Sequence, residues 1–505
     1  MYHIEMKKRR AIRGLKPGRL LPLGGLFLFF GLTTLILILG LNSCGTPPKT
    51  VEEKETPQDR TGGIVPAPKP ESVPEPEITG TELILARMAK FLDEDKFTEA
   101  IALFDEIDPE EAAATSMRLL KASVLSSAGK NQEARTLVNE ILLAEADNTE
   151  ALYVLAATYA AGRKEKEQKQ TLEKILKIDP NHVETLVSLG DISLRADSYR
   201  NAGGYYDRAL AADPENGSAL VGRALVYRYS HNLQKASALL NQAVSLYPRW
   251  YVPWNERGRL NRSMGALPQA VSDLSTASKL APNDFWVHCD LGKTLIDMNR
   301  KAEALEELTL AVKLDPKNFL AYVYTGGIKD ELGDYDGAEA DYTVVTKLNP
   351  GYYFAWEGLG IIKMRKGKWA EARDAFLEAY KYAPKENAYA LLAAANWMRT
   401  GRPQDPKQFL ATALRPVSRD SLEWYMMRLY HDLTGDADVA GRIDREKNLI
   451  TKARMAYYMA LYYEIRGSAI LADRYYSLVK TLDQKGIPEW RLNEWAFTQR
   501  NLAIH

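Results

Sequence analysis

Residues 283–316 read NDFWVHCDLGKTLIDMNRKAEALEELTLAVKLDP, and this segment of 34 residues shows the pattern from which the fold can be predicted. Its last residue belongs to a series of prolines in which each follows the previous one by 34 residues. The members are Pro180, Pro214, Pro248, Pro282, Pro316, Pro350 and Pro384. Because proline makes up only about 5% of residues in average proteins, this constant interval indicates an internal repeat. A proline that recurs in this way predicts short helices that end and restart once per repeat.

Further columns of small and large residues follow the same register. The alanine column comprises Ala100, Ala134, Ala202, Ala236, Ala270, Ala304, Ala338 and Ala372, and Gln168 and Pro406 interrupt it. A glycine column comprises Gly190, Gly258, Gly292, Gly326 and Gly360, and a column of large residues includes Phe104, Tyr206, Tyr342 and Phe376. Small residues let the two helices of a repeat approach closely, and large ones fill the space beside them.

A third column predicts the turn between the two helices of each repeat. It comprises Gly129, Gly265, Gly333, Gly367 and Gly401, with Asn299 at the same position. Glycine and asparagine are the residues that most readily adopt the left-handed conformation at the end of a helix.

The period and these columns resemble the tetratricopeptide repeat (TPR), a helix–turn–helix unit of 34 residues. The resemblance implies an all-α fold, a right-handed α-solenoid of stacked repeats in which each unit covers the apolar face of its neighbour. Nine repeats are predicted over residues 81–384 and a degenerate repeat over 385–420. Residues 421–505 are predicted to be helical, with one further TPR-like repeat at 453–486 and a capping helix after Pro488.

Residues 1–44 have the form of an export signal. Residues 1–19 hold seven basic side chains and one acidic side chain, and residues 20–44 hold no charge. The tetrapeptide Leu41-Asn42-Ser43-Cys44 resembles the bacterial lipobox, whose cysteine is lipidated and becomes the first residue of the mature protein. The resemblance implies a bacterial TPR lipoprotein, anchored to a membrane by a covalent lipid on Cys44 and facing the periplasm in the cell envelope. Gly45 is not the aspartate of enterobacterial inner-membrane retention, which is compatible with the outer membrane.

An uncleaved signal anchor in the inner membrane is the alternative for this segment. Asn42 stands where the lipobox usually has a small or aliphatic residue. The apolar run is also close to the ~20 residues that span a bilayer. Residues 45–80 then hold eight prolines and few apolar groups. This composition predicts a disordered, proline-rich tether between the membrane and the repeats.

Composition and motifs exclude several classes of function. After Cys44 the chain has 59 basic and 65 acidic residues, a net charge of −6, which argues against a nucleic-acid partner. Cys44 and Cys289 form no disulfide framework and match no zinc motif. No catalytic or nucleotide-binding motif is present. The sequence therefore predicts a protein that is not an enzyme and holds no metal or cofactor, the lipid on Cys44 aside. His288 and Cys289 are expected to be packing residues.

The resemblance implies that function lies in the groove formed by the first helix of each repeat. The side chains expected to bind a protein or peptide partner there are Arg228, Asn255, Arg259, Arg262, Trp286, Asp290, Lys293, Phe354 and Glu357. The cations would hold a carboxylate, and the aromatic rings would hold an apolar side chain. The lysine, asparagine and arginine clamp of chaperone-tail-binding TPR proteins has no match at the corresponding positions.

A second hypothesis is an accessory of an envelope transporter that binds or channels a small ligand. Such a protein needs an enclosed apolar cavity, for which the tyrosine and tryptophan residues of 250–254 and 352–356 are the candidates. An enzymatic site would have to lie in residues 421–505, whose composition gives no indication of one.

Overall fold

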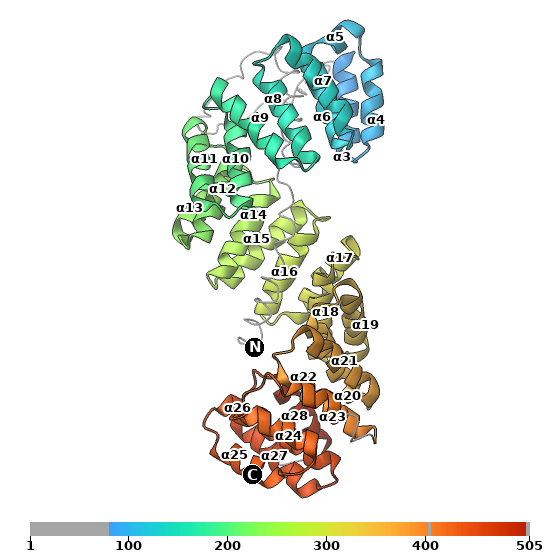
Figure 1. The fold of residues 1–505 in the computed structure, drawn as a ribbon. Coiled ribbons are helices and arrows are strands. Elements are labelled where there is room, and N and C mark those ends of the chain that lie inside the picture. The colour runs from blue at the N-terminus through green and yellow to red at the C-terminus, as the bar shows by residue number, and fades with distance from the viewer. Residues whose placement is uncertain (1–79, 402–405, 501–505) are drawn as a thin grey trace, which may run out of the picture. The chain divides into compact units, whose positions relative to one another are not determined.

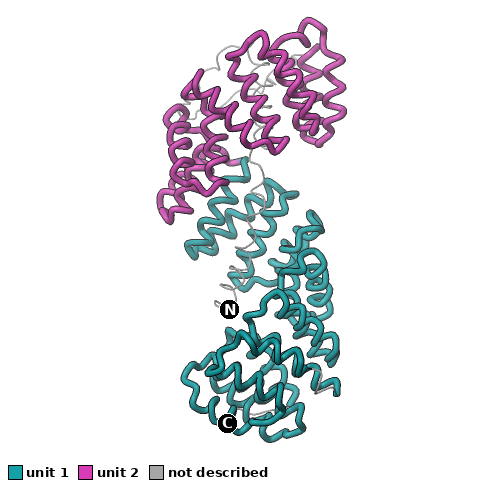
Figure 2. The backbone as a smooth tube through the Cα atoms, viewed as in Figure 1, with its two compact units in different colours: residues 1–18, 249–505 teal, residues 19–248 magenta. Residues whose placement is uncertain are grey.

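The computed structural model describes residues 80–401 and 406–500, and these form 26 α-helices, one 3-10 helix and no strand (Figure 1). The predicted export signal, Cys44 and the proline-rich tether lie outside the described residues. The described residues divide into two compact units, with the boundary between residues 248 and 249 (Figure 2). We call described residues 80–248 the N-terminal unit and described residues from 249 onward the C-terminal unit.

The N-terminal unit contains the following helices: α3 (Thr81–Asp93), α4 (Phe97–Ala102), η1 (Leu103–Glu106), α5 (Pro109–Ala113), α6 (Thr115–Ser127), α7 (Asn131–Ala144), α8 (Thr149–Ala161), α9 (Glu165–Ile178), α10 (Val183–Arg195), α11 (Tyr199–Ala212), α12 (Gly217–Tyr229) and α13 (Leu233–Leu246). From α6 onward they pack as antiparallel pairs of 13 and 14 residues. Before α6 the pattern is less regular, because α4 ends after six residues and the short helices η1 and α5 follow it.

The C-terminal unit begins with four helix pairs of the same kind: α14 (Tyr251–Ser263), α15 (Leu267–Leu280), α16 (Phe285–Asp297), α17 (Lys301–Leu314), α18 (Phe319–Leu332), α19 (Tyr335–Leu348), α20 (Tyr353–Arg365) and α21 (Trp369–Tyr382). Its remaining helices are α22 (Asn387–Arg399), α23 (Pro406–Ala413), α24 (Leu422–Asp432), α25 (Asp436–Arg445), α26 (Leu449–Ile465), α27 (Ala469–Leu482) and α28 (Pro488–Gln499). The predicted all-α architecture of stacked helix pairs is confirmed.

The columns read from the sequence are contacts between the two helices of a repeat. All eight alanines of the alanine column are fully buried. A Cβ atom added to Gly292 would lie 2.6 Å from Cγ of Leu308, and one added to Gly190 would lie 2.6 Å from the Tyr206 ring. The glycines therefore make room for the large residue sixteen positions later, as predicted.

The aromatic ring at the fourth position of a repeat can hydrogen-bond to the carbonyl oxygen of the proline that ends the preceding repeat. Trp356 Nε1 donates to the carbonyl oxygen of Pro350 at 2.9 Å, and His288 Nε2 lies 2.9 Å from that of Pro282. His288 is 5% exposed, and its Nδ1 lies 2.6 Å from Glu307 Oε2. The expectation that His288 is a packing residue is confirmed, because both ring nitrogens are occupied within the repeat.

The C-terminal unit ends in a core rich in tyrosine. Helix α26 has ten buried residues, nine of them consecutive from Met455 to Tyr463. A helix that is apolar all round must be covered on every side, and α22, α24, α25, α27 and α28 pack against it. Helix α28 also reaches the repeats: Arg491 Nη2 donates to Asp330 Oδ2 of α18 at 2.6 Å. The last helix is thus bonded to a repeat that lies 161 residues earlier in the chain.

Candidate partner-binding groove

Four of the predicted groove residues form one charged network on the first helices α14 and α16. Arg259 Nε lies 3.5 Å from Asp290 Oδ2, and Lys293 Nζ donates to Asp290 Oδ1 at 3.0 Å. Arg262 Nε, on the same face of α14, donates to Asp297 Oδ2 at 2.6 Å. Neighbouring first helices are therefore linked by ion pairs along the predicted binding face.

Asp290 is the centre of this network. Its side chain is 11% exposed, and burial opposes its ionisation, but Lys293 and Arg259 outweigh that effect and hold the pKa of the carboxyl below its ordinary value. Asp290 in turn raises the pKa of Lys293. All three groups are charged at neutral pH. Arg259 Nη1 also donates to Glu256 Oε1 at 2.7 Å, so the two cations lie beside two buried carboxylates, Asp290 and Glu256.

Asn255 lies one turn before Arg259 on α14 and is 8% exposed. Its Oδ1 accepts no hydrogen bond from the residues that the structure describes. A buried amide oxygen costs free energy unless it accepts a hydrogen bond.

Trp286 and Cys289 lie on the neighbouring α16. The Trp286 ring is perpendicular to that of Phe285, with centroids 5.0 Å apart, and is partly buried. Cys289 is 3% exposed, and burial raises the pKa of its thiol to about 12. The expectation that Cys289 is a packing residue is confirmed, because its side chain is buried in the apolar cluster of α16 and α17.

Phe354 and Glu357 lie on α20 and belong to a different cluster. The Phe354 ring packs on that of Tyr353 with centroids 4.2 Å apart. Glu357 Oε2 accepts a hydrogen bond from the hydroxyl of Tyr389 at 2.5 Å. Arg228 lies on α12 of the N-terminal unit, where its guanidinium group is 5.2 Å from the ring centroid of Tyr229.

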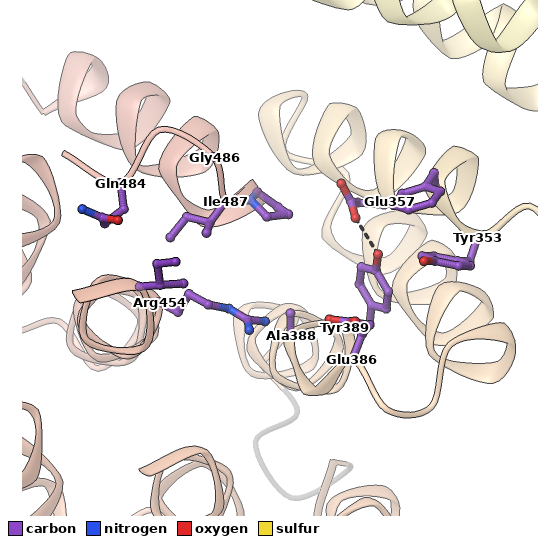
Figure 3. Close-up of a pocket in the computed structure, with 12 residues that line it drawn as sticks. Tyr353, Glu357, Glu386, Ala388, Tyr389, Arg454, Gln484, Gly486 and Ile487 are labelled. Carbon is purple, nitrogen blue, oxygen red and sulfur yellow. Dashed lines mark hydrogen bonds between the residues drawn. The ribbon is translucent and has the colours of Figure 1, made fainter. Parts of the chain in front are cut away.

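The α20 cluster forms part of a pocket of about 160 Å³ in the C-terminal unit (Figure 3). Its lining residues are Tyr353, Phe354, Glu357, Glu386, Ala388, Tyr389, Ile450, Arg454, Gln484, Gly486, Ile487 and Pro488. Only two of the predicted residues, Phe354 and Glu357, are among them. Tyr353 belongs to the 352–356 segment that the second hypothesis named for a ligand cavity. The remaining lining residues were not predicted, and no feature of the repeat indicates that Arg454 or the segment 484–488 would meet α20.

No group of His, Cys, Asp and Glu side chains in residues 80–401 and 406–500 has the arrangement of a metal site. In that same part of the chain, no helix combines the length and apolar character needed to cross a bilayer.

Two family models match this arrangement of helices. The model of the tetratricopeptide repeat protein 21 N-terminal ARM repeat matches residues 81–271, and a tetratricopeptide repeat model matches residues 289–353. The stacked helix pairs are thus repeats of the tetratricopeptide type. TPR units are protein-interaction modules whose stacked first helices form an extended binding surface.

Solved structures similar to this chain have low sequence identity to it. YrrB, a TPR protein with an unusual peptide-binding site, is 20% identical, with 37% of this chain and 95% of that chain covered and a TM-score of 0.33. PilF of Pseudomonas aeruginosa is 20% identical, with coverages of 40% and 92% and a TM-score of 0.37. The APC/C hetero-tetramer Cut9–Hcn1 is 18% identical, with coverages of 60% and 59% and a TM-score of 0.45. A search of the curated proteins found no match.

Proposed function

We propose that this repeat protein is a non-catalytic scaffold that binds a protein or peptide partner along the first helices of its C-terminal unit. The observation that carries the proposal is the network of Arg259, Asp290 and Lys293 beside Asn255. It combines charged groups with a buried amide oxygen that lacks a donor among the described residues. A peptide in extended conformation would bring carboxylate groups to the partly exposed cations Arg259 and Lys293, which keep their bonded carboxylates, and backbone N–H groups to the amide.

The test is partner capture with charge-reversed protein. Full-length protein is crosslinked in native membranes, and its partners are compared with those of the Arg259→Glu/Arg262→Glu variant. We expect the variant to lose the partner while its circular dichroism stays unchanged. The matched control is Lys279→Glu/Lys313→Glu, which makes the same change of charge at exposed sites on the second helices α15 and α17. Equal capture by the wild type and the groove variant would refute this location of the binding surface.

We further propose that a lipid on Cys44 holds the scaffold to a membrane of the cell envelope, facing the periplasm. The support is the sequence alone: a basic leader, an uncharged apolar run and a lipobox-like tetrapeptide. Several acyl chains on one residue bind a membrane firmly, because each buried CH₂ contributes about 0.8 kcal/mol. Cys44→Ala should abolish acyl labelling and leave the precursor unprocessed by lipoprotein signal peptidase. Normal processing of that variant would favour the signal anchor instead.

A small-ligand accessory of a transporter is the second candidate, since the pocket at α20 includes aromatic residues of the 352–356 segment. Its volume of about 160 Å³ is below the roughly 300–1,000 Å³ of sites that hold drug-sized ligands. This pocket is therefore matched to a single side chain of a partner.

A further inference from the structure

The pocket at α20 has walls of two chemical kinds. Tyr353, Phe354 and Tyr389 contribute aromatic rings to the lining, and Ile450 and Ile487 contribute aliphatic groups. Figure 3 shows Tyr353 and Tyr389 on one side of the pocket and Ile487 on the other. An aromatic wall combined with aliphatic groups suits a side chain that is long, apolar along its stem and flat or charged at its end.

Carboxylates predominate among the charged groups of the pocket. Glu357 and Glu386 line it, and Arg454 is the one cation among the described lining residues. Arg454 already has a carboxylate of its own, since its Nε donates to Glu489 Oε1 at 3.1 Å. Glu489 is fully buried and also accepts a hydrogen bond from Tyr458 at 2.6 Å. Arg454 also interacts electrostatically with Glu386. The charged lining residues, two glutamates and one arginine, together carry one more negative than positive charge.

Arg491, a second cation of the C-terminal unit, is also paired with a buried carboxylate. Arg491 on α28 bonds to Asp330 at 2.6 Å, and the side chain of Asp330 is only 2% exposed. An anionic ligand would have to take Arg454 or Arg491 away from a buried carboxylate and leave that carboxylate unpaired. This exchange is unfavourable.

The titration of the tyrosines agrees with a negative potential in the pocket. Burial, then Glu386 and Glu357, raise the pKa of Tyr353 to about 12. Burial, then Glu357, raise the pKa of Tyr389 well above its ordinary value. Neighbouring carboxylates disfavour a second negative charge and favour a positive one.

We propose that this pocket binds a cationic side chain of the partner peptide, arginine in preference to lysine. The inference rests on the proposed peptide-binding function and names the chemistry of one partner residue. A guanidinium group stacks on aromatic faces and donates to carboxylates in its own plane, which an ammonium group cannot do. The pocket volume of about 160 Å³ is close to the roughly 150 Å³ that accommodates a benzene-sized group, and it therefore suits one such side chain.

Methyl NMR of the full chain in detergent micelles tests the proposal. Isoleucine methyl groups are labelled, and the signals of Ile450 and Ile487 are assigned by Ile→Leu substitution at each position. The probes are three capped peptides, acetyl-Ala-Xaa-Ala-amide, in which Xaa is arginine, citrulline or glutamate. We expect the arginine peptide to shift both signals saturably and the neutral citrulline peptide to bind roughly tenfold more weakly, because it lacks the charge-assisted hydrogen bonds. The glutamate peptide should cause no shift.

The variant Glu357→Gln/Glu386→Gln keeps the shape of the pocket and removes its charge. We expect arginine and citrulline peptides to bind this variant equally. The control Glu306→Gln, at an exposed site on α17, should keep the preference for arginine. Equal shifts by arginine and citrulline in the wild type, a stronger response to glutamate, or no shift of either methyl signal would each overturn the proposal.

The outcome is independent of the capture experiment with the α14 variant. If native membranes yield a partner that requires Arg259 and Arg262 but the arginine peptide shifts neither methyl signal, the pocket proposal alone fails. If the arginine peptide binds the pocket but capture does not depend on Arg259 and Arg262, the α14–α16 binding surface fails and the pocket proposal stands.

Discussion

The residue at the turn between the two helices of a repeat differs from repeat to repeat, but its backbone conformation stays the same. Ten positions spaced by 34 residues all have a positive φ, including the predicted Gly129, Gly265 and Asn299. The same conformation occurs at Asp95, Arg163, Asp197 and His231, which the sequence did not indicate. The packing of the two helices thus imposes the left-handed turn even on residues that pay for it in strain.

Arg163 is the residue at which relief of this strain is simplest to measure. It is exposed and has a φ of 56°. Arg163→Gly should raise the stability of its helix pair by roughly 1 kcal/mol, because glycine adopts the left-handed region without a Cβ clash. The reverse change at the equivalent Gly129, to alanine, should lower it. Thermal unfolding by circular dichroism measures both, and a lower midpoint for Arg163→Gly would contradict this explanation.

His288 is expected to make stability depend on pH. Glu307, opposed by burial, raises the pKa of the imidazole, and Pro282 also favours the charged ring. The contribution of the ionised ring is complete below the unfolded-state pKa of about 6.5. It is lost as the pH rises through the higher folded-state pKa.

The matched variant for this prediction is His288→Gln. The difference in thermal midpoint between wild type and variant should shrink as the pH is raised from about 6 to about 9. A histidine NMR titration, assigned with the same variant, should give a midpoint for His288 above the ordinary value. A midpoint below that value would show that burial outweighs Glu307.

At the scale of the element, a small residue on the first helix of a repeat faces a large residue on the second helix, and this pairing sets how closely the two helices pack. The absence of a Cβ atom at Gly292 allows the Leu308 side chain to lie against the backbone of α16. Gly327 of α18 is also helical, but a Cβ atom added there would meet nothing within 4 Å. An added methyl group would therefore clash at Gly292, whereas there is room for one at Gly327.

Gly292→Ala and Gly327→Ala should therefore change stability in opposite directions. The first forces Leu308 to move and should cost about 1–3 kcal/mol. The second replaces a partly exposed helical glycine whose Cβ position is open, and it should stabilise by roughly 0.5–1 kcal/mol. Denaturant unfolding of both variants checks the pair, and similar effects of the two substitutions would show that the close approach at Gly292 has no energetic weight.

At the scale of the whole molecule, helix α28 connects the end of the chain to the repeats of the C-terminal unit. The connection is the bond from Arg491 to Asp330, whose carboxylate is buried and whose Oδ1 accepts no hydrogen bond from the described residues. Arg491 is therefore needed to satisfy a charge on α18 as well as to hold α28.

Arg491→Met should destabilise the attachment of α28 by about 2 kcal/mol, because it leaves a buried carboxylate unpaired. Hydrogen exchange of the α28 amides should then rise more than tenfold. Arg442→Met, which breaks the exposed Arg442–Asp438 pair of α25, should change exchange little. Adding Asp330→Asn to Arg491→Met should recover part of the loss. Unchanged exchange in the single variant would mean that α28 is held by its apolar contacts alone.

The sequence by itself determined the repeats, because the contacts that define them join residues at constant short separations. Gly292 and Leu308 are sixteen residues apart, and the same spacing recurs in every well-formed repeat, so periodicity reports it directly. The face of the first helices followed from the same register, which is why Arg259, Asp290 and Lys293 were predicted together. Their mutual ion pairs were not predicted, since side-chain direction depends on the neighbouring helix.

Tertiary structure alone decided the pocket and the attachment of the last helix. Arg454 meets Glu489, and Arg491 meets Asp330 across 161 residues, at separations that are not multiples of the repeat. Such pairs form only where the degenerate helices after α22 turn the chain back toward α18 and α20, and that turn depends on how the tyrosine-rich core packs around α26. These contacts occur once and do not recur with the 34-residue period. The periodicity of the sequence therefore cannot predict them, and only the folded structure shows them.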